Sequence, residues 1–491
     1  ENVIDAGEKY GQVGTDDKEK KLQELTELSE ARKEKMIDLM KENPDLFKRY
    51  VIDEETRNKL PSNVQDNIEK RVTEEGIVNS LYADDFQNPE NSREVYTLNE
   101  KNLYLDKKIS LASGERLEIE GYEIGGNILA QIDDDAIPIL NKTLKKKIDI
   151  PFGNQKMIVI LMDWIDKKGV LHEGISKEEA YDSVFNQANA YYTENSYGKL
   201  GISGDVVGPY QTWTPCDPSG SIRLADKDVN FKNYDAIIIF YPYYLRENNI
   251  CDFDGMATIG KTPILTDDGE VYLSYSINLR KELWTVGHEI GHQFGVMHAN
   301  LLDCGGSISN PENCNTYEYG DPFDIMGNVG TRTRGINPHL NSYHKEEIGF
   351  LSENQSVITT NGEYTLTPIE TSGEGIKFIR IPLPGKGYDY YLEYRQPIGF
   401  DKDINDELYK GVLLHLAPLG DTALYYPKDI TLKPGQTFED RLNMVNITTL
   451  SANADSARVK IESNIKPFAE ITIRGMSVEE IPILNQSTTV K

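Results

Sequence analysis

The chain has 491 residues, more than one hydrophobic core usually organises, so we expect roughly two to four domains. Its 80 acidic and 52 basic residues give a formal net charge of −28, which argues against nucleic acid or an anionic membrane as a partner because both would repel the chain. No apolar run approaches the roughly 18 residues needed to cross a bilayer, so we also expect no transmembrane segment.

Residues 1–148 are predicted to be helical at first and then rich in β-strands. Residues 1–14 are polar and contain glycine, and we expect no ordered structure there. An apolar stripe predicts a long helix that ends at Pro44, and a capping-box pattern predicts a short helix from Ser62. From Glu94 to Ile148, short alternating segments broken by glycine and aspartate predict strands.

Residues 149–352 are predicted to form an α/β unit. The run Met157 to Trp164 is apolar on both faces and indicates a buried central strand. Ser176 and Glu179 form a capping box at the start of a helix. Further strands are predicted at Ala236 to Pro242 and at Val271 to Ile277. We expect a cleft under an edge strand, to which an extended peptide could add by main-chain hydrogen bonds.

The segment HEIGHQFGVMH, from His288 to His298, predicts a metal site. His288 and His292 lie one helical turn apart, which suits two nitrogen ligands of one metal. Glu289 points about 100° around the helix and is placed as a base. Gly295 can end the helix in a left-handed conformation and bring His298 back as a third ligand. Three ligands leave the fourth tetrahedral position open, as in catalytic zinc sites.

The alternative is that these histidines are structural residues of an ordinary helix. Only seven histidines occur in the chain, and three of them fall within these eleven residues. The surrounding sequence also favours a helix that buries one face in the core, because apolar residues recur there at helical intervals. These are Leu279, Leu283, Val286, Ile290 and Phe294. Gly287 and Gly291 are poor helix formers, and we expect another segment to pack close to them.

Residues 353–464 are predicted to form a β-sandwich, because short β-branched or aromatic segments alternate there with Gly, Pro and Asp. His415 is interpreted as a strand residue and Met326, taken alone, as core filling. Residues 465–491 are too few for a domain and are interpreted as a tail or a truncated module. The basic run at residues 145–147 marks a candidate linker and protease cut site.

Four cysteines surround the motif and favour two disulfides, Cys304 with Cys314 and Cys216 with Cys251. Disulfides and a first residue that is not Met indicate a secreted chain whose leader has been removed. The alternative is four buried free thiols. The acidic runs at 251–255 and 266–269 are interpreted first as turns and second as Ca²⁺ sites, since their spacing does not match a calcium loop.

The motif HEIGHQFGVMH followed by DIMG resembles the extended zinc signature and Met-turn of metzincin endopeptidases, and most of all the secreted gametolysin and immune inhibitor A type. Further similar stretches span residues 150 to 455, among them MIVILMDWID, YYTENSYGKLGISGDVVGPY and HLNSYHKEEIGFL. The resemblance implies that His288, His292 and His298 bind Zn²⁺, that Glu289 is the general base and that Met326 lies beneath the metal.

Two positions depart from the family pattern. Immune inhibitor A relatives often carry Asp where this chain has His298, so the match leans toward gametolysin. Some metzincins place a tyrosine two residues after the Met-turn methionine as a further ligand or oxyanion donor, and here that residue is Asn328. Tyr343 is a weak candidate for that role.

Metzincins are commonly made as zymogens, so the resemblance implies that residues 1–148 are a propeptide that occupies the cleft. No cysteine precedes Cys216, which excludes a cysteine switch supplied by this segment. An acidic side chain, from Asp84, Asp85 or one of Asp133 to Asp135, could displace the catalytic water instead.

The sequence therefore predicts an α+β multidomain protein with a metzincin-like domain, made of a twisted sheet and an active-site helix, between a propeptide and a β-sandwich. The predicted function is that of a secreted, monomeric zinc endopeptidase acting on proteins or peptides, with calcium as a second candidate ion. The alternatives are a zinc-fold adhesin or matrix-binding module with little catalysis, and a zinc hydrolase acting on other substrates.

Overall fold

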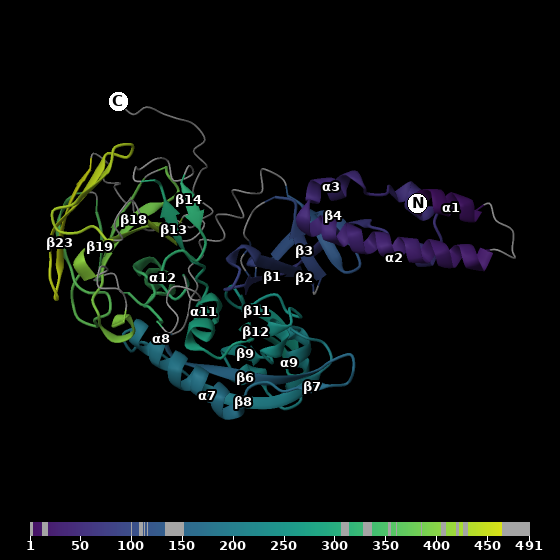
Figure 1. Cartoon of the computed structure of the whole chain (residues 1–491), viewed down its shortest axis with the longest axis horizontal. Coiled ribbons are helices and arrows are strands. Elements are labelled where there is room, and N and C mark those ends of the chain that lie inside the picture. The colour runs from purple at the N-terminus through teal and green to yellow at the C-terminus, as the bar shows by residue number, and fades with distance from the viewer. Residues whose placement is uncertain are drawn as a thin grey trace, which may run out of the picture.

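The computed structural model describes residues 3–11, 18–99, 101–107, 111, 113–114, 116–132, 152–305, 314–327, 336–351, 355–359, 361–383, 385–403, 409–418, 422–425 and 431–463. In Figure 1 the purple N-terminal helices lie at one side and the yellow-green C-terminal strands at the other, with α11 between them. The predicted cut site at 145–147 and Asp133 to Asp135 lie outside the described residues.

The N-terminal part begins with five helices, and most of them pack around a small apolar core. They are α1 (Val3–Gly11), α2 (Lys18–Glu42), α3 (Pro44–Arg49), α4 (Glu54–Asn58) and α5 (Ser62–Gln65). The expectation that residues 1–14 lack order is wrong for α1, because Val3 is buried against α2 and α5 with Leu25 and Val64. The long helix and its end at Pro44 are confirmed. The helix from Ser62 is confirmed but lasts one turn only.

Five strands follow: β1 (Lys70–Asp84), β2 (Arg93–Leu98), β3 (Lys101–Leu105), β4 (Arg116–Ile124) and β5 (Asn127–Gln131), with the short helix η2 (Pro89–Asn91) between β1 and β2. The strand-rich region therefore starts at Lys70 and not at Glu94 as predicted. β1 is long enough to pair with three other strands of one sheet. Its first half pairs with β4, its second half pairs with β2 on one side, and its last four residues pair with β10 on the other.

The central strands continue the same sheet. They are β6 (Gly153–Ile165), β7 (Leu171–His172), β8 (Leu200–Thr212), β9 (Ala236–Phe240), β10 (Gly255–Thr258), β11 (Thr262–Thr266) and β12 (Gly269–Asn278). Across the described residues the sheet runs β2-β3-β5-β4-β1-β10-β12-β9-β6-β7, with β8 beside β6 and β11 beside β12. The strands predicted from Met157, Ala236 and Val271 are confirmed. β10 and β11 were not predicted, and β10 is the strand that meets β1.

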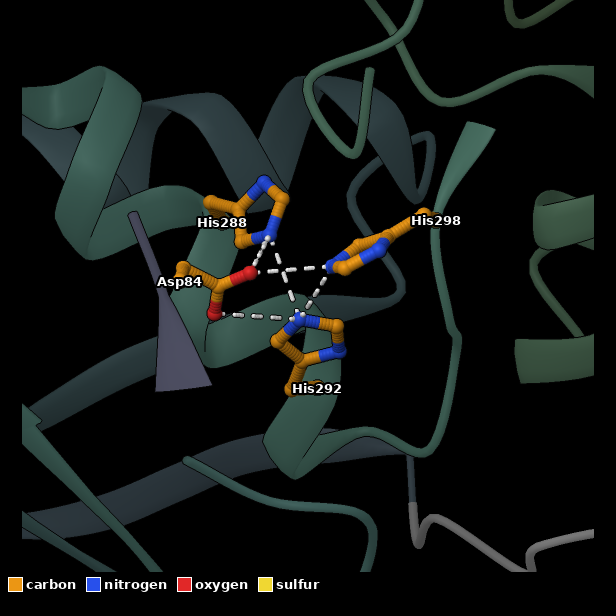
Figure 2. A group of neighbouring side chains, drawn as sticks. All are labelled: Asp84, His288, His292 and His298. Atoms are coloured by element: carbon orange, nitrogen blue, oxygen red, sulfur yellow. Dashed lines mark hydrogen bonds and ion pairs between the residues drawn. The ribbon is translucent and has the colours of Figure 1, made fainter. Parts of the chain in front are cut away.

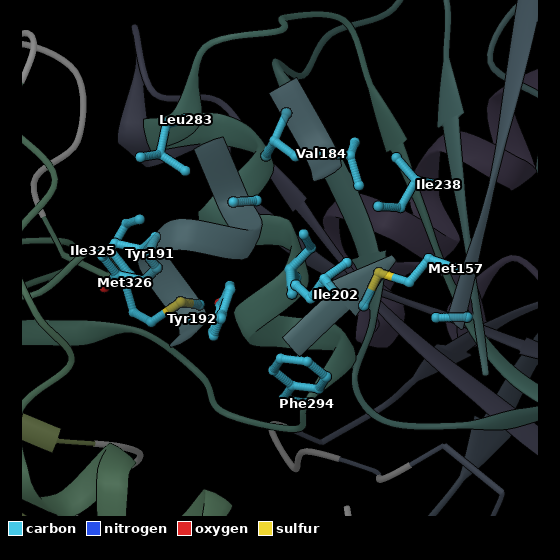
Figure 3. Close-up of a cluster of buried hydrophobic side chains, with 14 of the residues drawn as sticks. Met157, Val184, Tyr191, Tyr192, Ile202, Ile238, Leu283, Phe294, Ile325 and Met326 are labelled. Carbon is cyan, nitrogen blue, oxygen red and sulfur yellow. The ribbon is translucent and has the colours of Figure 1, made fainter. Parts of the chain in front are cut away.

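Helices cover both faces of this central part, which is why β6 is apolar on both sides. Met157 and Val159 point into the core that holds α7 (Lys177–Tyr181), η3 (Asp182–Ala188), α8 (Asn189–Asn195) and α11 (Leu283–Gln293), shown in Figure 3. Ile158 and Ile160 point into the opposite core, under α9 (Pro218–Asp226), η4 (Phe231–Asn233) and α10 (Tyr244–Glu247). The capping box that begins α7 at Ser176 is formed as predicted.

The C-terminal strands form two sheets that share one core. One sheet runs β14-β13-β20-β19-β18-β17-β15 and the other β16-β23-β22-β21. The elements are β13 (Ala299–Asp303), β14 (Asn315–Tyr317), α12 (Ser342–Ile348), β15 (Ser356–Ile358), β16 (Gly362–Leu366), β17 (Phe378–Ile381), β18 (Asp389–Tyr394), η7 (Gly399–Asp401), β19 (Val412–Ala417), β20 (Thr422–Tyr425), β21 (Thr437–Asp440), β22 (Val445–Ala452) and β23 (Ala457–Ser463). β13, directly after His298, pairs in parallel with β20. The strand that follows the motif thus belongs to the C-terminal sheet.

The predicted α+β class with several sheets is confirmed by this architecture. Both predicted disulfides, Cys216–Cys251 and Cys304–Cys314, are formed. The acidic run at 266–269 is a turn, since Thr266 and Gly269 close the β11–β12 hairpin. Within the described residues, every helix is too short or too polar to cross a membrane.

Candidate metal centre

The helix α11 is held in place by close packing at its two glycines. A Cβ atom at Gly287 would lie 2.7 Å from the Ile325 side chain, and one at Gly291 would collide with the Met326 sulfur. Tyr192 also donates a hydrogen bond from its hydroxyl to the Gly287 carbonyl at 2.6 Å. The expected close approach is therefore confirmed, and the approaching segment is the one that carries Met326.

The three motif histidines converge at the end of this helix (Figure 2). Gly295 has φ of +91°, and the chain turns back there so that His298 faces the helix. The Nε2 atoms of His288 and His292 are 3.1 Å apart, and those of His292 and His298 are 3.2 Å apart. Ligand nitrogens about 2.0–2.1 Å from a tetrahedral metal would lie about 3.3 Å from one another. The observed spacing fits a shared metal.

The opposite ring nitrogens fix which atom of each histidine faces the centre. Nδ1 of His288 lies 2.9 Å from the Ile325 carbonyl, and Nδ1 of His292 lies 2.8 Å from the Val296 carbonyl. Because a carbonyl can only accept, both Nδ1 atoms carry the proton and both Nε2 atoms present lone pairs. Nδ1 of His298 is 3.0 Å from a Glu318 carboxylate oxygen. Lone pairs that converge in a buried space suit a metal cation between them.

Asp84, at the end of β1, completes the group. Its Oδ1 is 3.0 Å from Nε2 of His298 and 3.5 Å from Nε2 of His288, and its Oδ2 is 3.5 Å from Nε2 of His292. All four side chains are buried, and one donor atom from each lies within 4.8 Å of the others. Figure 2 shows the carboxylate facing the three rings. These residues can hold a metal ion. Asp84 takes the fourth ligand position, for which the motif itself supplies no residue.

The ionisable side chains of the centre shift one another's pKa values. Against the effect of burial, the rings of His288 and His292 hold the pKa of Asp84 well below its ordinary value. Burial lowers the pKa of His292 to about 4. Burial also acts to lower the pKa of His298, but the carboxylates of Asp84 and Glu318 raise it to about 9. An ionised carboxylate therefore faces three imidazole rings, and a metal bound here would replace the proton that the raised pKa places on His298.

Glu289, the predicted base, is buried on the side of α11 that faces β10. A Cβ atom at Gly255 of that strand would collide with the Glu289 carboxylate, so the strand passes directly over the acid. Burial, followed by the negative charge of Asp84, raises the pKa of Glu289 well above its ordinary value. The negative charge of Asp84 thus opposes ionisation of Glu289.

Met326 lies buried against α11, and two aspartates shape the loop that carries it. Asp324 accepts from the Met326 backbone N–H at 2.8 Å, and His344 of α12 lies 2.9 Å from its other oxygen. Asp321 accepts from the Phe323 backbone N–H and lies 3.0 Å from Nε2 of His415. His415 is a strand residue of β19, as expected, and anchors this loop from the C-terminal sheet.

Tyr319 is a residue of the centre that the sequence did not indicate. Its hydroxyl donates to Asp84 Oδ1 at 2.5 Å, and its ring lies 4.0 Å from that of His298. Tyr343, the candidate named from sequence, instead donates to Glu347 and packs its ring on Tyr391. Asn328 lies outside the described residues. The one sequence signal for Tyr319 was its position in the short aromatic segment before GDPFDIMG.

Neither a protein-family model nor a curated protein matches this chain. The geometry of the centre and the residues of its motif are therefore the basis for any assignment.

Proposed function

We propose that the chain is the latent form of a secreted zinc-dependent endopeptidase of the metzincin type. The observation that carries the proposal is the convergence of three histidine Nε2 atoms around a position that Asp84, from a distant strand, fills. Three imidazoles and one carboxylate suit Zn²⁺ better than Ca²⁺ or Mg²⁺, which prefer oxygen ligands. The two disulfides suit an oxidising compartment and support secretion.

Zinc held by His288, His292 and His298 would polarise a substrate carbonyl and lower the pKa of water. Glu289, beside this position, takes the proton of the attacking water and returns it to the leaving amine. That role requires an ionised carboxylate. Departure of Asp84 removes the negative charge that, after burial, most opposes ionisation of Glu289. It thus frees the metal position and favours the ionised form of the base.

The strand β10 supports a peptide as the substrate. Its residues Gly255 to Thr258 pair antiparallel with Leu81 to Asp84 of β1, which runs across the site as an extended chain. A peptide that replaced β1 would form the same main-chain bonds and pass the metal at the level of Gly255. Because main-chain bonds do not depend on side chains, this arrangement favours a protease over a hydrolase of small esters or sugars.

The N-terminal part also supports latency without a cysteine. β1 enters the sheet, Asp84 occupies the metal position, and Phe86 packs its ring 5.0 Å from that of His288. These contacts exclude both water and substrate from the centre. We therefore propose that residues 1–148 act as an inhibitory propeptide with Asp84 as its key residue, one of the candidates named from sequence.

The test is digestion of casein or gelatin by protein that has been folded as the full chain and then matured by limited proteolysis. We expect digestion that stops with a chelator and returns with zinc. Glu289→Ala should keep its metal and lose activity by about 10²- to 10⁴-fold, the usual contribution of general base catalysis. His292→Ala should lose both metal and activity, whereas Glu178→Ala, an exposed glutamate, should change neither.

Zinc-loaded matured protein that binds gelatin without cutting it would contradict the proposal and favour the adhesin alternative. Full activity in Glu289→Ala would contradict the assignment of the base.

A further inference from the structure

The residue after Asp84 makes a buried ion pair across the cleft. Asp85 is 3% exposed, and its Oδ1 accepts from Nη2 of Arg246 in α10, which is 5% exposed. Asp85 also accepts hydrogen bonds from the backbone N–H groups of Gln87 and Asn88. An acidic side chain of the N-terminal segment is thus fully enclosed against a cation of the central part.

The direction of the segment relates this contact to the proposed cleavage site. Asp84 pairs with Gly255 and occupies the metal position, so Asp85 lies one residue further toward the C-terminus of the bound strand. Phe86 comes next and packs its ring 5.3 Å from that of Trp284 at the start of α11. A substrate in the same direction would place residues after the cleaved bond against Arg246.

The charges around Arg246 do not balance without Asp85. Asp254 lies 3.4 Å from Nε of Arg246 and 2.6 Å from Nε of Arg280, so two guanidinium groups share one carboxylate. Asp254 also accepts from the Phe86 backbone N–H at 3.1 Å. When Asp85 leaves, one positive charge remains without a partner within this group of residues. A cation in a cleft that has lost its partner favours an incoming carboxylate.

The backbone that carries Arg246 is fixed by contacts within the central part. The backbone N–H of Arg246 donates to the Tyr243 carbonyl, the backbone N–H of Asn249 donates to the Arg246 carbonyl, and the Cys216–Cys251 disulfide ties the loop to the preceding segment. A guanidinium on a fixed backbone loses less freedom when it binds a carboxylate than one on a mobile loop, and its fork matches carboxylate geometry.

We propose that Arg246 is the specificity-determining residue of a subsite that binds an Asp or Glu side chain in the first two positions after the scissile bond. Asp85 occupies this subsite in the latent chain and stands in for the substrate's acid. The inference rests on the proposed function and names the class of peptide that the centre would cut.

The experiment uses the full chain, matured by limited proteolysis, and peptides that differ only at the two positions after a common cleaved bond. We expect kcat/KM to be roughly ten- to hundredfold higher for Asp or Glu than for Asn or Gln, the worth of a hydrogen-bonded ion pair. Arg246→Ala should bring this ratio near one, and Arg246→Lys should keep an acidic preference. Arg223→Ala, an exposed arginine of α9, is the matched control and should leave the ratio unchanged.

Because the ratio compares two peptides on one preparation, partial misfolding of a variant does not affect it. Cleavage with equal rates for acidic and neutral peptides, or an unchanged ratio in Arg246→Ala, would overturn the inference and leave the proposed protease intact. Failure to cut any peptide by zinc-loaded protein would overturn the proposed function itself, and with it the inference.

Discussion

Replacement of Asp84 in the full chain should partly release the latent centre. Its carboxylate lies 3.0 Å from His298 Nε2 and accepts a 2.5 Å hydrogen bond from Tyr319. Each charge-assisted bond of this kind contributes about 1.5–3 kcal/mol, so loss of even one should raise the population with an open cleft by about 10- to 150-fold. The four β1–β10 residue pairs and the Asp85–Arg246 pair remain, so the activity should stay below that of matured protein.

The assay compares cleavage of a quenched peptide by unprocessed wild type, Asp84→Ala and Asp84→Asn, with the chain checked by gel for intact length. Asn keeps the shape of the side chain but carries no charge, so both variants should be active before any processing. Asp45→Ala is the matched control, because this aspartate of the same N-terminal region has a side chain that is 86% exposed.

The reasoning would be refuted if unprocessed Asp84→Ala were as inactive as unprocessed wild type while both became equally active after proteolysis. The N-terminal part would then block the cleft by bulk alone.

Three further substitutions test other parts of the account. His415→Leu leaves Asp321 buried without its 3.0 Å partner and should destabilise the chain by about 3–5 kcal/mol, seen as a lower urea midpoint that Asp321→Asn partly restores. Burial lowers the pKa of Lys345 from 10.5 to about 7, so the unfolded chain binds more protons between these values and wild-type stability rises with pH there. Lys345→Met lacks this gain, so urea titrations should show its stability falling relative to wild type between pH 7 and 10. A difference in stability that stays constant over this range would contradict the lowered pKa of Lys345. Gly255→Ala places a methyl group against Glu289 and should lower turnover while metal content stays unchanged.

The metal ligands were predictable because their information is local. The four-residue spacing of His288 and His292 fixes one face of a helix, and Gly295 marks the turn that returns His298. The strand β6 was equally predictable, because it is buried on both faces and its sequence is therefore a continuous apolar run.

The sequence limited the residue that blocks the metal position to a few aspartates but did not identify Asp84 among them. Asp84, Asp85 and the run Asp133 to Asp135 were equivalent candidates, because nothing local says which of them reaches the metal. The choice depends on the antiparallel pairing of β1 with β10. The predicted strand-rich region began at Glu94, so β1 was not predicted, and β10 is only four residues long.

The sequence also did not indicate which C-terminal residues support the metal centre. Parallel pairing of β13 with β20 joins residues more than 120 positions apart, and His415 of the neighbouring strand β19 reaches Asp321, which lies 94 positions away in the sequence. Tyr319 was missed for a related reason. Its hydroxyl reaches the centre through a backbone with φ of +53°, a conformation that a bulky residue rarely adopts and that the sequence does not signal.

Metal analysis of the purified full chain, combined with X-ray absorption at the zinc edge, tests the central claim most directly. The account predicts one zinc per chain, with three nitrogen neighbours and one oxygen neighbour at about 2.0–2.2 Å, and loss of that zinc in His292→Ala. In Asp84→Ala the zinc should stay while its oxygen neighbour becomes water. Wild-type protein that takes up no zinc at stoichiometric level, or binds it equally well without His292, would contradict the account.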